Sequence, residues 1–204
     1  MTPLPGAVAS GAASREASTA TAPNEIRRRA LHVAAGVLGP LAAWLGPGIA
    51  TPAFAALVAV AGAAEWARFH WPGVEARLER LAHGALRPWE ARSVSGASLL
   101  AVGFAVAWWL FPSAVAERAI LVAALADPMA ATVGSRFGGG TRKSWVGTAA
   151  CAVTAALVLL LTGLRVVPTA AAAVVAAVAE RVPWHGVDNV AVPLGVGAVL
   201  WWLG

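Results

Sequence analysis

The chain has 204 residues, of which 59% are hydrophobic and 12% are charged, with a mean hydropathy of +0.71. This balance is too apolar for an ordinary soluble domain and is typical of an integral membrane protein. The formal net charge of +5 comes without a basic patch interleaved with aromatic residues, so nucleic-acid binding is not indicated. Cys151 is the single cysteine, which excludes internal disulfides and thiolate metal sites.

Residues 1–24 are rich in Ala, Ser, Thr, Pro and Gly, and they lack a basic start and an apolar core. We expect a disordered tail here, not a signal peptide. Residues 25–204 then form one transmembrane domain. Its apolar runs lack strict alternation, which favours helices over a transmembrane barrel.

The fold class predicted for this domain is all-α, a polytopic transmembrane bundle of about seven helices. The predicted helices cover approximately residues 30–45, 49–66, 97–111, 119–133, 148–164, 169–179 and 190–203. Several of these runs are shorter than the ~20 residues that cross a bilayer, and 169–179 is the weakest span. Between the second and third helices, residues 74–86 predict an amphipathic helix on the inner surface, with Val74, Leu78 and Leu81 facing lipid.

The basic residues are distributed unevenly along this bundle. With seven spans and the N-terminus inside, thirteen basic residues fall on the inner side, and only Arg118 and Arg165 fall outside. Because Lys and Arg in short loops mark the cytoplasmic side, we expect the N-terminus, residues 67–96 and residues 134–147 to face the cytoplasm.

The first helix carries a polar face near its start. Glu25, Arg28, Arg29 and His32 recur at spacings of three and four, which places them on one side of a helix. They form either a basic collar that anchors the chain or part of a polar site. His32 lies further into the predicted membrane span than an anchoring collar requires.

Asp127 lies inside an apolar run, where a carboxylate normally faces a polar cavity or a partner. Pro128 follows it and cannot donate to the carbonyl of Ala124, so we expect the helix to kink or break at Asp127. An acid at such a break predicts a seat for Mg²⁺ bound to a polyphosphate. The alternative is an aspartate paired with an arginine for packing.

The segment that follows, residues 134–147, is rich in glycine and in positive charge. Successive glycines let backbone N–H groups converge on an anion, and the cationic side chains supply counter-charge. The expected nucleotide-binding residues are Gly134, Arg136, Gly138, Gly139, Gly140, Arg142, Lys143, Ser144 and Gly147. Lys143 is the only lysine in the chain, which favours a chemical role for it. By composition alone, the segment fits a solvated positive-inside loop equally well.

A second acidic position, Asp188 followed by Asn189, lies at the start of the last helix, and Glu180 is at the end of the helix before it. Asp188 taken alone indicates a helix cap. Asp127 and Asp188 on separate helices could share one metal ion, so the expected metal ligands are Asp127, Asp188 and Asn189. This arrangement requires that residues 169–179 cross the membrane.

The order D-x-x-A-x-x-x-G-x-x-F-G, then K-S, then a glycine runs from Asp127 to Gly147. It resembles the signature of the dolichol kinase and phytol kinase family of membrane lipid kinases. Three weaker matches arrive in the family's order: RRALH at 28–32, RPWEARSVSGAS at 87–98 and ERVPWHGVDNVAVPL at 180–194. The chain departs from the family in having Ala126 before Asp127, Pro128 after it, and a longer glycine run.

The resemblance implies transfer of a phosphoryl group, usually from CTP, to the hydroxyl of an isoprenoid alcohol or, in one branch, of diacylglycerol. A divalent cation such as Mg²⁺ is implied, with CTP or ATP as donor. Phosphoryl transfer needs in-line positioning and neutralised charge, which the acidic and cationic residues above could supply. The expected catalytic residues are Asp127, Lys143 and Asp188. The residues expected to bind the lipid or support the site are Arg28, Arg29, His32, Glu65, Arg92, Gly96 and Glu180.

Two other functions remain open at this point. A membrane cytidylyltransferase would join CTP to a lipid phosphate, but its closing Pro-Gly-His-Gly-Gly signature is absent. A transporter would spread polar residues through the bilayer, whereas here they gather at one side. The expected partners are a membrane lipid alcohol and a nucleoside triphosphate, with a homo-oligomer as an open alternative.

Overall fold

A computed structural model describes residues 25–71, 73–81, 90, 93–138, 143–182 and 186–204. The predicted disordered tail and four predicted site residues lie outside the described residues. These four are Arg92, Gly139, Gly140 and Arg142.

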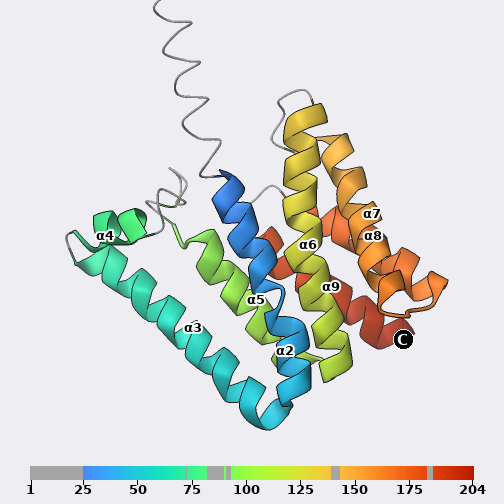
Figure 1. Ribbon diagram of the computed structural model, residues 1–204, viewed down its shortest axis with the longest axis horizontal. Coiled ribbons are helices and arrows are strands. Elements are labelled where there is room, and N and C mark those ends of the chain that lie inside the picture. Colours follow the sequence, from blue (N-terminus) through green and yellow to red (C-terminus); the bar gives the residue numbers. More distant parts are fainter. Residues whose placement is uncertain (1–24, 72, 82–89, 91–92, 139–142, 183–185) are drawn as a thin grey trace, which may run out of the picture.

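Every regular element in the described ranges is an α-helix, so the predicted all-α fold is confirmed. Residues 25–35 are helical and precede eight further helices. These are α2 (Leu38–Leu45), α3 (Pro47–His70), α4 (Val74–Leu81), α5 (Gly96–Leu110), α6 (Ser113–Phe137), α7 (Trp145–Leu161), α8 (Val166–Glu180) and α9 (Asp188–Leu203). Figure 1 shows α6 near the centre, with α7 and α8 on one side of it and α3 on the other.

The prediction of one helix over residues 30–45 is wrong, because a turn at Gly36 and Val37 divides it. The Gly36 N–H donates to the Val33 carbonyl at 3.0 Å, a bond over three residues that is tighter than α-helical bonding. The division lies where this segment crosses α6. A Cβ at Gly36 would lie 2.6 Å from the Cβ of Ala124, so only glycine permits the close approach.

A kink or a break was predicted at Asp127, and the break does not occur. α6 continues from Ser113 to Phe137 with Pro128 inside it. Proline removes one backbone donor, but the surrounding helices hold α6 in place, since it packs against α2, α5, α7 and α9. The hydroxyl of Thr132 donates to the Pro128 carbonyl at 2.6 Å, in the turn that follows the proline.

Alanine and glycine lie at the contacts between helices, so the helices pack closely. The buried side chains of α6 are mostly alanines, and small residues let helix backbones approach one another. Between α6 and α7, a Cβ at Gly147 would lie 2.8 Å from the carbonyl oxygen of Ala130. The backbones of these two helices therefore meet directly.

Two of the segments that pack against α6 run in the opposite direction to it. α6 and α7 are antiparallel, because Gly134 adjoins Gly147 near one end, and Arg118 Nε donates to Thr162 Oγ1 at 3.3 Å near the other. The helical pair formed by residues 25–35 and α2 crosses α6 in the opposite sense, since Gly36 adjoins Ala124 and Gly39 adjoins Glu117. Both neighbours are therefore antiparallel to α6.

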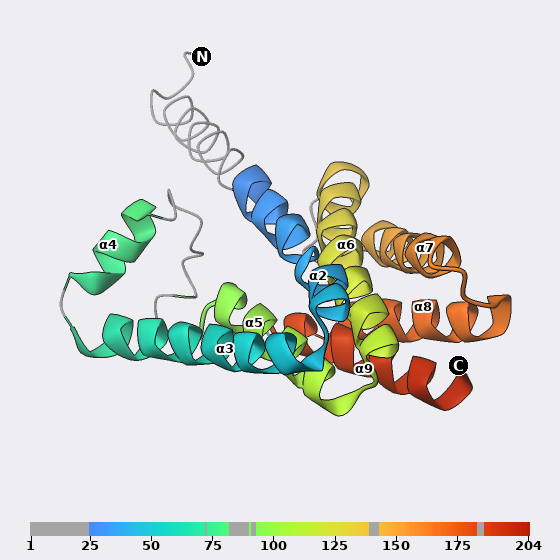
Figure 2. The ribbon, with the colours of Figure 1, turned by 60° about the horizontal axis from the view of Figure 1, so that its bottom comes forward.

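α3 lies at the edge of this bundle and is largely exposed. Only Ala50, Phe54 and Arg68 are buried along its length. It is the one helix in the described part of the chain that is long and apolar enough to cross a membrane, and α5, α7, α8 and α9 are shorter apolar helices. Figure 2 shows α4 turned away from the bundle at the far end of α3.

Candidate active site

Three segments meet around the side chain of Lys143. Its ammonium nitrogen lies 2.9 Å from Oδ2 of Asp188, at the start of α9, and 3.1 Å from Oε1 of Glu180, at the end of α8. The same ammonium donates to the backbone carbonyl of Glu180. We call Lys143, Glu180 and Asp188 the lysine cluster. One cation thus holds two carboxylates and the C-terminal end of α8.

The residues after Lys143 fix its position. Ser144 caps α7 by accepting a hydrogen bond from the N–H of Gly147, at 3.1 Å. The hydroxyl of Thr148 lies 3.3 Å from Oε2 of Glu180 and within 3.2 Å of the Ser144 carbonyl. The start of α7 is therefore attached both to its own cap and to the end of α8.

Two glycines of the predicted phosphate loop have a clear packing role. A Cβ at Gly134 would lie 3.0 Å from the Ser144 hydroxyl, and one at Gly138 would collide with the same hydroxyl. Together with the contact of Gly147 with Ala130, these glycines bring the end of α6 against the start of α7. The glycine spacing that predicted a phosphate-binding loop is therefore already required by the packing of α6 against α7.

The electrostatic surroundings keep Lys143 charged. Its burial acts to lower its pKa, but Asp188 and Glu180 outweigh this effect and hold the pKa above the ordinary value of 10.5. Since the folded-state pKa is raised, the stabilisation from these ion pairs is complete below the ordinary pKa. It is lost only as the pH rises through the raised value. The side chain remains 22% exposed, so a phosphate can reach it.

A second polar cluster links the N-terminal helix to α6. Nδ1 of His32 lies 3.9 Å from Oδ2 of Asp127, and Arg29 donates to Thr132 Oγ1 at 3.2 Å. Glu25 lies 3.7 Å from Arg29, so the predicted polar face does point at α6. We call Glu25, Arg29, His32 and Asp127 the histidine cluster.

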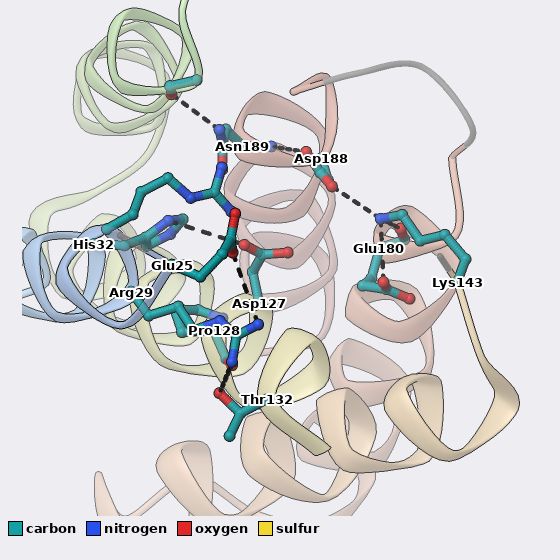
Figure 3. A network of polar contacts seen from close by, with 12 residues as sticks. Glu25, Arg29, His32, Asp127, Pro128, Thr132, Lys143, Glu180, Asp188 and Asn189 are labelled. Carbon is teal, nitrogen blue, oxygen red and sulfur yellow. Dashed lines mark hydrogen bonds and ion pairs between the residues drawn. The ribbon is translucent and has the colours of Figure 1, made fainter. Parts of the chain in front are cut away.

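The two clusters are electrostatically joined through Asp127. Its carboxylate is acted on by Asp188, Lys143 and Glu180, and also by Arg28. Figure 3 shows Asp127 between His32 on one side and the Lys143 and Asp188 pair on the other. Asp127 lies ten residues before the end of α6, or about 15 Å along the helix. The site therefore extends from the end of the bundle into its interior.

Asp188 is the first residue of α9 and not its cap, since the capping position is occupied by Val187. Its neighbour Asn189 donates through Nδ2 to the Gly96 carbonyl at 2.9 Å (Figure 3). Glu65, in turn, accepts hydrogen bonds at the start of α5, from the Ser95 N–H at 2.9 Å. The predicted supporting residues Glu65 and Gly96 are thus connected to the metal-ligand candidates.

Arg136 is a predicted site residue that the structure does not bring to either cluster. It is exposed in the last turn of α6, with its guanidinium carbon 5.7 Å from the centre of the Phe137 ring. Sequence reasoning missed Thr132 and Thr148, which bond within the two clusters, and the buried Arg68. Their signals are local: Thr148 follows Ser144 by four residues, and Arg68 follows Glu65 by three.

Asp127 and Asp188 are the two carboxylates of the predicted magnesium site. Among the described residues, no group of three or more His, Cys, Asp and Glu side chains is arranged to hold a metal ion. Mg²⁺ in phosphoryl-transfer sites is usually bound by only one or two carboxylates, together with substrate phosphates and water. Asp127 and Asp188 repel each other, and a cation would relieve this repulsion.

The fold and site together define an all-helical protein with an acidic, lysine-bearing polar centre at one end of an apolar bundle. No family profile and no solved structure matches the chain. The chain is 31% identical to a phytol kinase from Synechocystis sp. over 206 aligned positions, covering 89% of this chain and 83% of that protein. It belongs to the phytol kinase and dolichol kinase family.

Proposed function

We propose that this protein is an integral membrane lipid kinase that transfers a phosphoryl group from a nucleoside triphosphate to an isoprenoid alcohol. The preferred donor in this proposal is CTP, with ATP as the alternative. One observation carries the proposal: Lys143 lies 2.9 Å from Asp188 at the start of α9, and Asp127 of α6 lies between this pair and His32 (Figure 3). These are the positions at which the sequence resembles the family signature, and the similarity to a phytol kinase agrees with this assignment.

The surface supports the membrane part of the proposal. Large apolar side chains are exposed on several helices, for example Val60 at 68%, Leu161 at 87%, Val174 at 61% and Trp202 at 89%. A soluble monomer rarely leaves so much apolar surface in water, whereas a bilayer would cover it. The antiparallel packing of α6 with α7, and of residues 25–45 with α6, supports successive spans. The thirteen-to-two division of basic residues supports a cytoplasmic site.

In this proposal the lysine cluster receives the nucleotide. An ammonium has three donors, so Lys143 can keep Asp188 as a partner while donating to a phosphate oxygen. As charge moves toward the leaving nucleotide, a fixed cation there stabilises the transition state. Ser144 and Gly147, at the start of α7, lie beside Lys143 and add the positive end of a helix to the same region.

Mg²⁺ would be held by Asp127 and Asp188, and when bound it would neutralise phosphate charge during transfer. The carboxylate of Asp127, deeper in the bundle, is the group placed to receive or orient the acceptor hydroxyl. His32 and Arg29 hold the N-terminal helix against this region. Because Asp127 lies between apolar helices, an acceptor with a long hydrocarbon chain fits the site better than a soluble alcohol.

The test is a transfer assay with purified protein in detergent and nucleotide labelled on the γ-phosphate. The acceptors are alcohols from geraniol size to polyprenol size, diacylglycerol and a lipid phosphate. A kinase moves the label onto an alcohol and releases CDP or ADP. Release of labelled pyrophosphate with the lipid phosphate would instead identify a cytidylyltransferase. Absence of both products with every acceptor would overturn the proposal.

A further inference from the structure

A buried ion pair at the end of α3 organises the segment before α5. Arg68 is only 7% exposed. Its Nε lies 3.1 Å from Oε2 of Glu65, and Nη2 donates to the same oxygen. The remaining donors reach two backbone carbonyls, those of Glu90 and Ser93 at 2.5 and 2.6 Å. One planar guanidinium therefore makes four hydrogen bonds, to a carboxylate and to two points of the adjacent chain, which is one more than the three donors of an ammonium allow.

Two carboxylates then fix the first turn of α5. Oε1 of Glu65 accepts from the Ser95 N–H at 2.9 Å and from the Ser98 hydroxyl at 2.8 Å. Oε1 of Glu90 accepts from the Gly96 N–H at 2.7 Å. These donors belong to a helix N-terminus, which would otherwise attract an anion. Protein carboxylates satisfy them instead, so this end of α5 is anchored and is not a phosphate site.

The anchored turn contacts the start of α9. The Gly96 carbonyl accepts from Asn189 Nδ2 at 2.9 Å, and a Cβ at Gly96 would lie 3.1 Å from Oε1 of Glu90. About two turns further along α5, a Cβ at Gly103 would collide with the backbone carbonyl of Asn189. α5 and α9 are therefore in direct contact next to Asp188, which holds Lys143.

We propose that Arg68 is a positioning residue of the kinase site, acting through the start of α5 and Asn189 on the placement of Asp188. This inference rests on the proposed function. Arg68 itself contacts neither cluster. A purely structural alternative is that the ion pair only attaches α3 to the bundle, in which case the start of α9 would not respond to its loss.

A double-mutant cycle on activity tests the connection. Arg68→Ala is expected to lower kcat by at least about tenfold, with the KM for the lipid alcohol nearly unchanged, because a misplaced reacting group costs rate and not acceptor binding. Arg68→Lys should retain only part of the activity. The Arg68→Ala, Asn189→Ala double variant should be about as slow as the slower single variant, since both act on one connection. Effects that multiply would overturn the inference.

The matched control is Arg80→Ala. Arg80 is an exposed arginine on α4 whose Nε bonds only to the Ala76 carbonyl of its own helix, at 3.1 Å. Its removal takes away the same charge without touching α5, so kcat should stay at the wild-type value. A loss of kcat equal to that of Arg68→Ala would assign the effect to net charge and overturn the inference.

Amide hydrogen exchange on the whole chain gives a readout that does not depend on activity. Arg68→Ala should speed exchange at Ser95 and Gly96, and also at Asn189 in the first turn of α9. Ser98→Ala, which removes one bond to Glu65, should show a smaller change of the same kind if Arg68→Ala does not fold. Ser135→Ala, an exposed serine on α6, is its control. Faster exchange in α5 with no change in α9 would overturn the inference. A wild-type protein without any kinase activity would instead overturn the proposed function.

Discussion

The ammonium nitrogen of Lys143 lies 2.9 Å from Oδ2 of Asp188, so the segment before α7 is attached to the first turn of α9. These two residues are separated by 45 positions in the chain and by two helices in the fold. The only lysine therefore has a structural task before any substrate arrives. In the proposed reaction it has a second task, which is to meet the nucleotide phosphates.

Lys143→Ala should raise the KM for nucleotide and lower kcat, because a phosphate-facing ammonium binds the ground state and also stabilises transition-state charge. We expect a loss of at least about tenfold in kcat/KM. Stability should also fall by about 2 kcal/mol, since Asp188 and Glu180 lose their shared cation. Steady-state kinetics with CTP and ATP, normalised to folded protein, measure KM and kcat, and thermal unfolding measures the loss of stability.

The conservative change Lys143→Arg should be partly active at best, because a planar guanidinium does not reproduce the contacts of a compact ammonium. Arg165→Ala is the control, since Arg165 precedes α8 at the opposite end of the bundle and makes no side-chain cap there. Near wild-type kcat/KM in Lys143→Ala would mean that the lysine only sets topology and local structure.

Gly147→Ala should destabilise the fold, whereas Gly62→Ala should not. At Gly147 a Cβ would lie 2.8 Å from the Ala130 carbonyl oxygen, and a backbone atom cannot move aside without moving α6. We expect a cost of roughly 1–3 kcal/mol. At Gly62, in α3, a Cβ would meet nothing within 4 Å, so alanine should be neutral or stabilising by up to about 1 kcal/mol. Thermal unfolding in detergent measures both. Equal effects would contradict the close helix contact.

The fold could be predicted to the level of helices and their approximate ends, because apolar runs and their breaks are visible in the sequence. The N-terminal residues Glu25, Arg28, Arg29 and His32 could be placed on one helix face by spacing alone, and the structure confirms that this face meets α6. The division at Gly36 could not be predicted, because it depends on how closely that turn approaches Ala124 of another helix.

The effect of Pro128 was predicted wrongly for a related reason. A proline removes one hydrogen bond and favours a break in an isolated helix, but α6 packs against five other helices and remains continuous through the proline. The connection of Glu65 to Arg68 and to the start of α5 could not be predicted from the sequence either. Local spacing could indicate the pair, but not that its remaining hydrogen bonds extend to residues 90–98.

Cysteine labelling should reveal a cytoplasmic site. In a Cys151→Ala background, a cysteine at Ser135, exposed near the end of α6, should resist an impermeant thiol reagent added outside intact cells. A cysteine at Val166, which is 73% exposed at the opposite end of the bundle, should react. The difference follows from the positive-inside rule applied to the loops. The reverse labelling pattern would contradict the topology and would separate the site from cytoplasmic nucleotide.

Asp127→Asn should separate stability from activity. The amide keeps the size of the side chain and removes a negative charge that Asp188 and Glu180 repel, so the variant should fold at least as well as the wild type. It should nevertheless lose at least about 10²-fold in kcat, because an amide is a poor replacement for a carboxylate that binds Mg²⁺ and orients the acceptor hydroxyl. Unfolding curves and kinetics on the same preparation, with a Mg²⁺ titration, measure the two effects. Loss of stability with normal activity per folded molecule would make Asp127 a structural partner of His32, and the metal assignment would then be wrong.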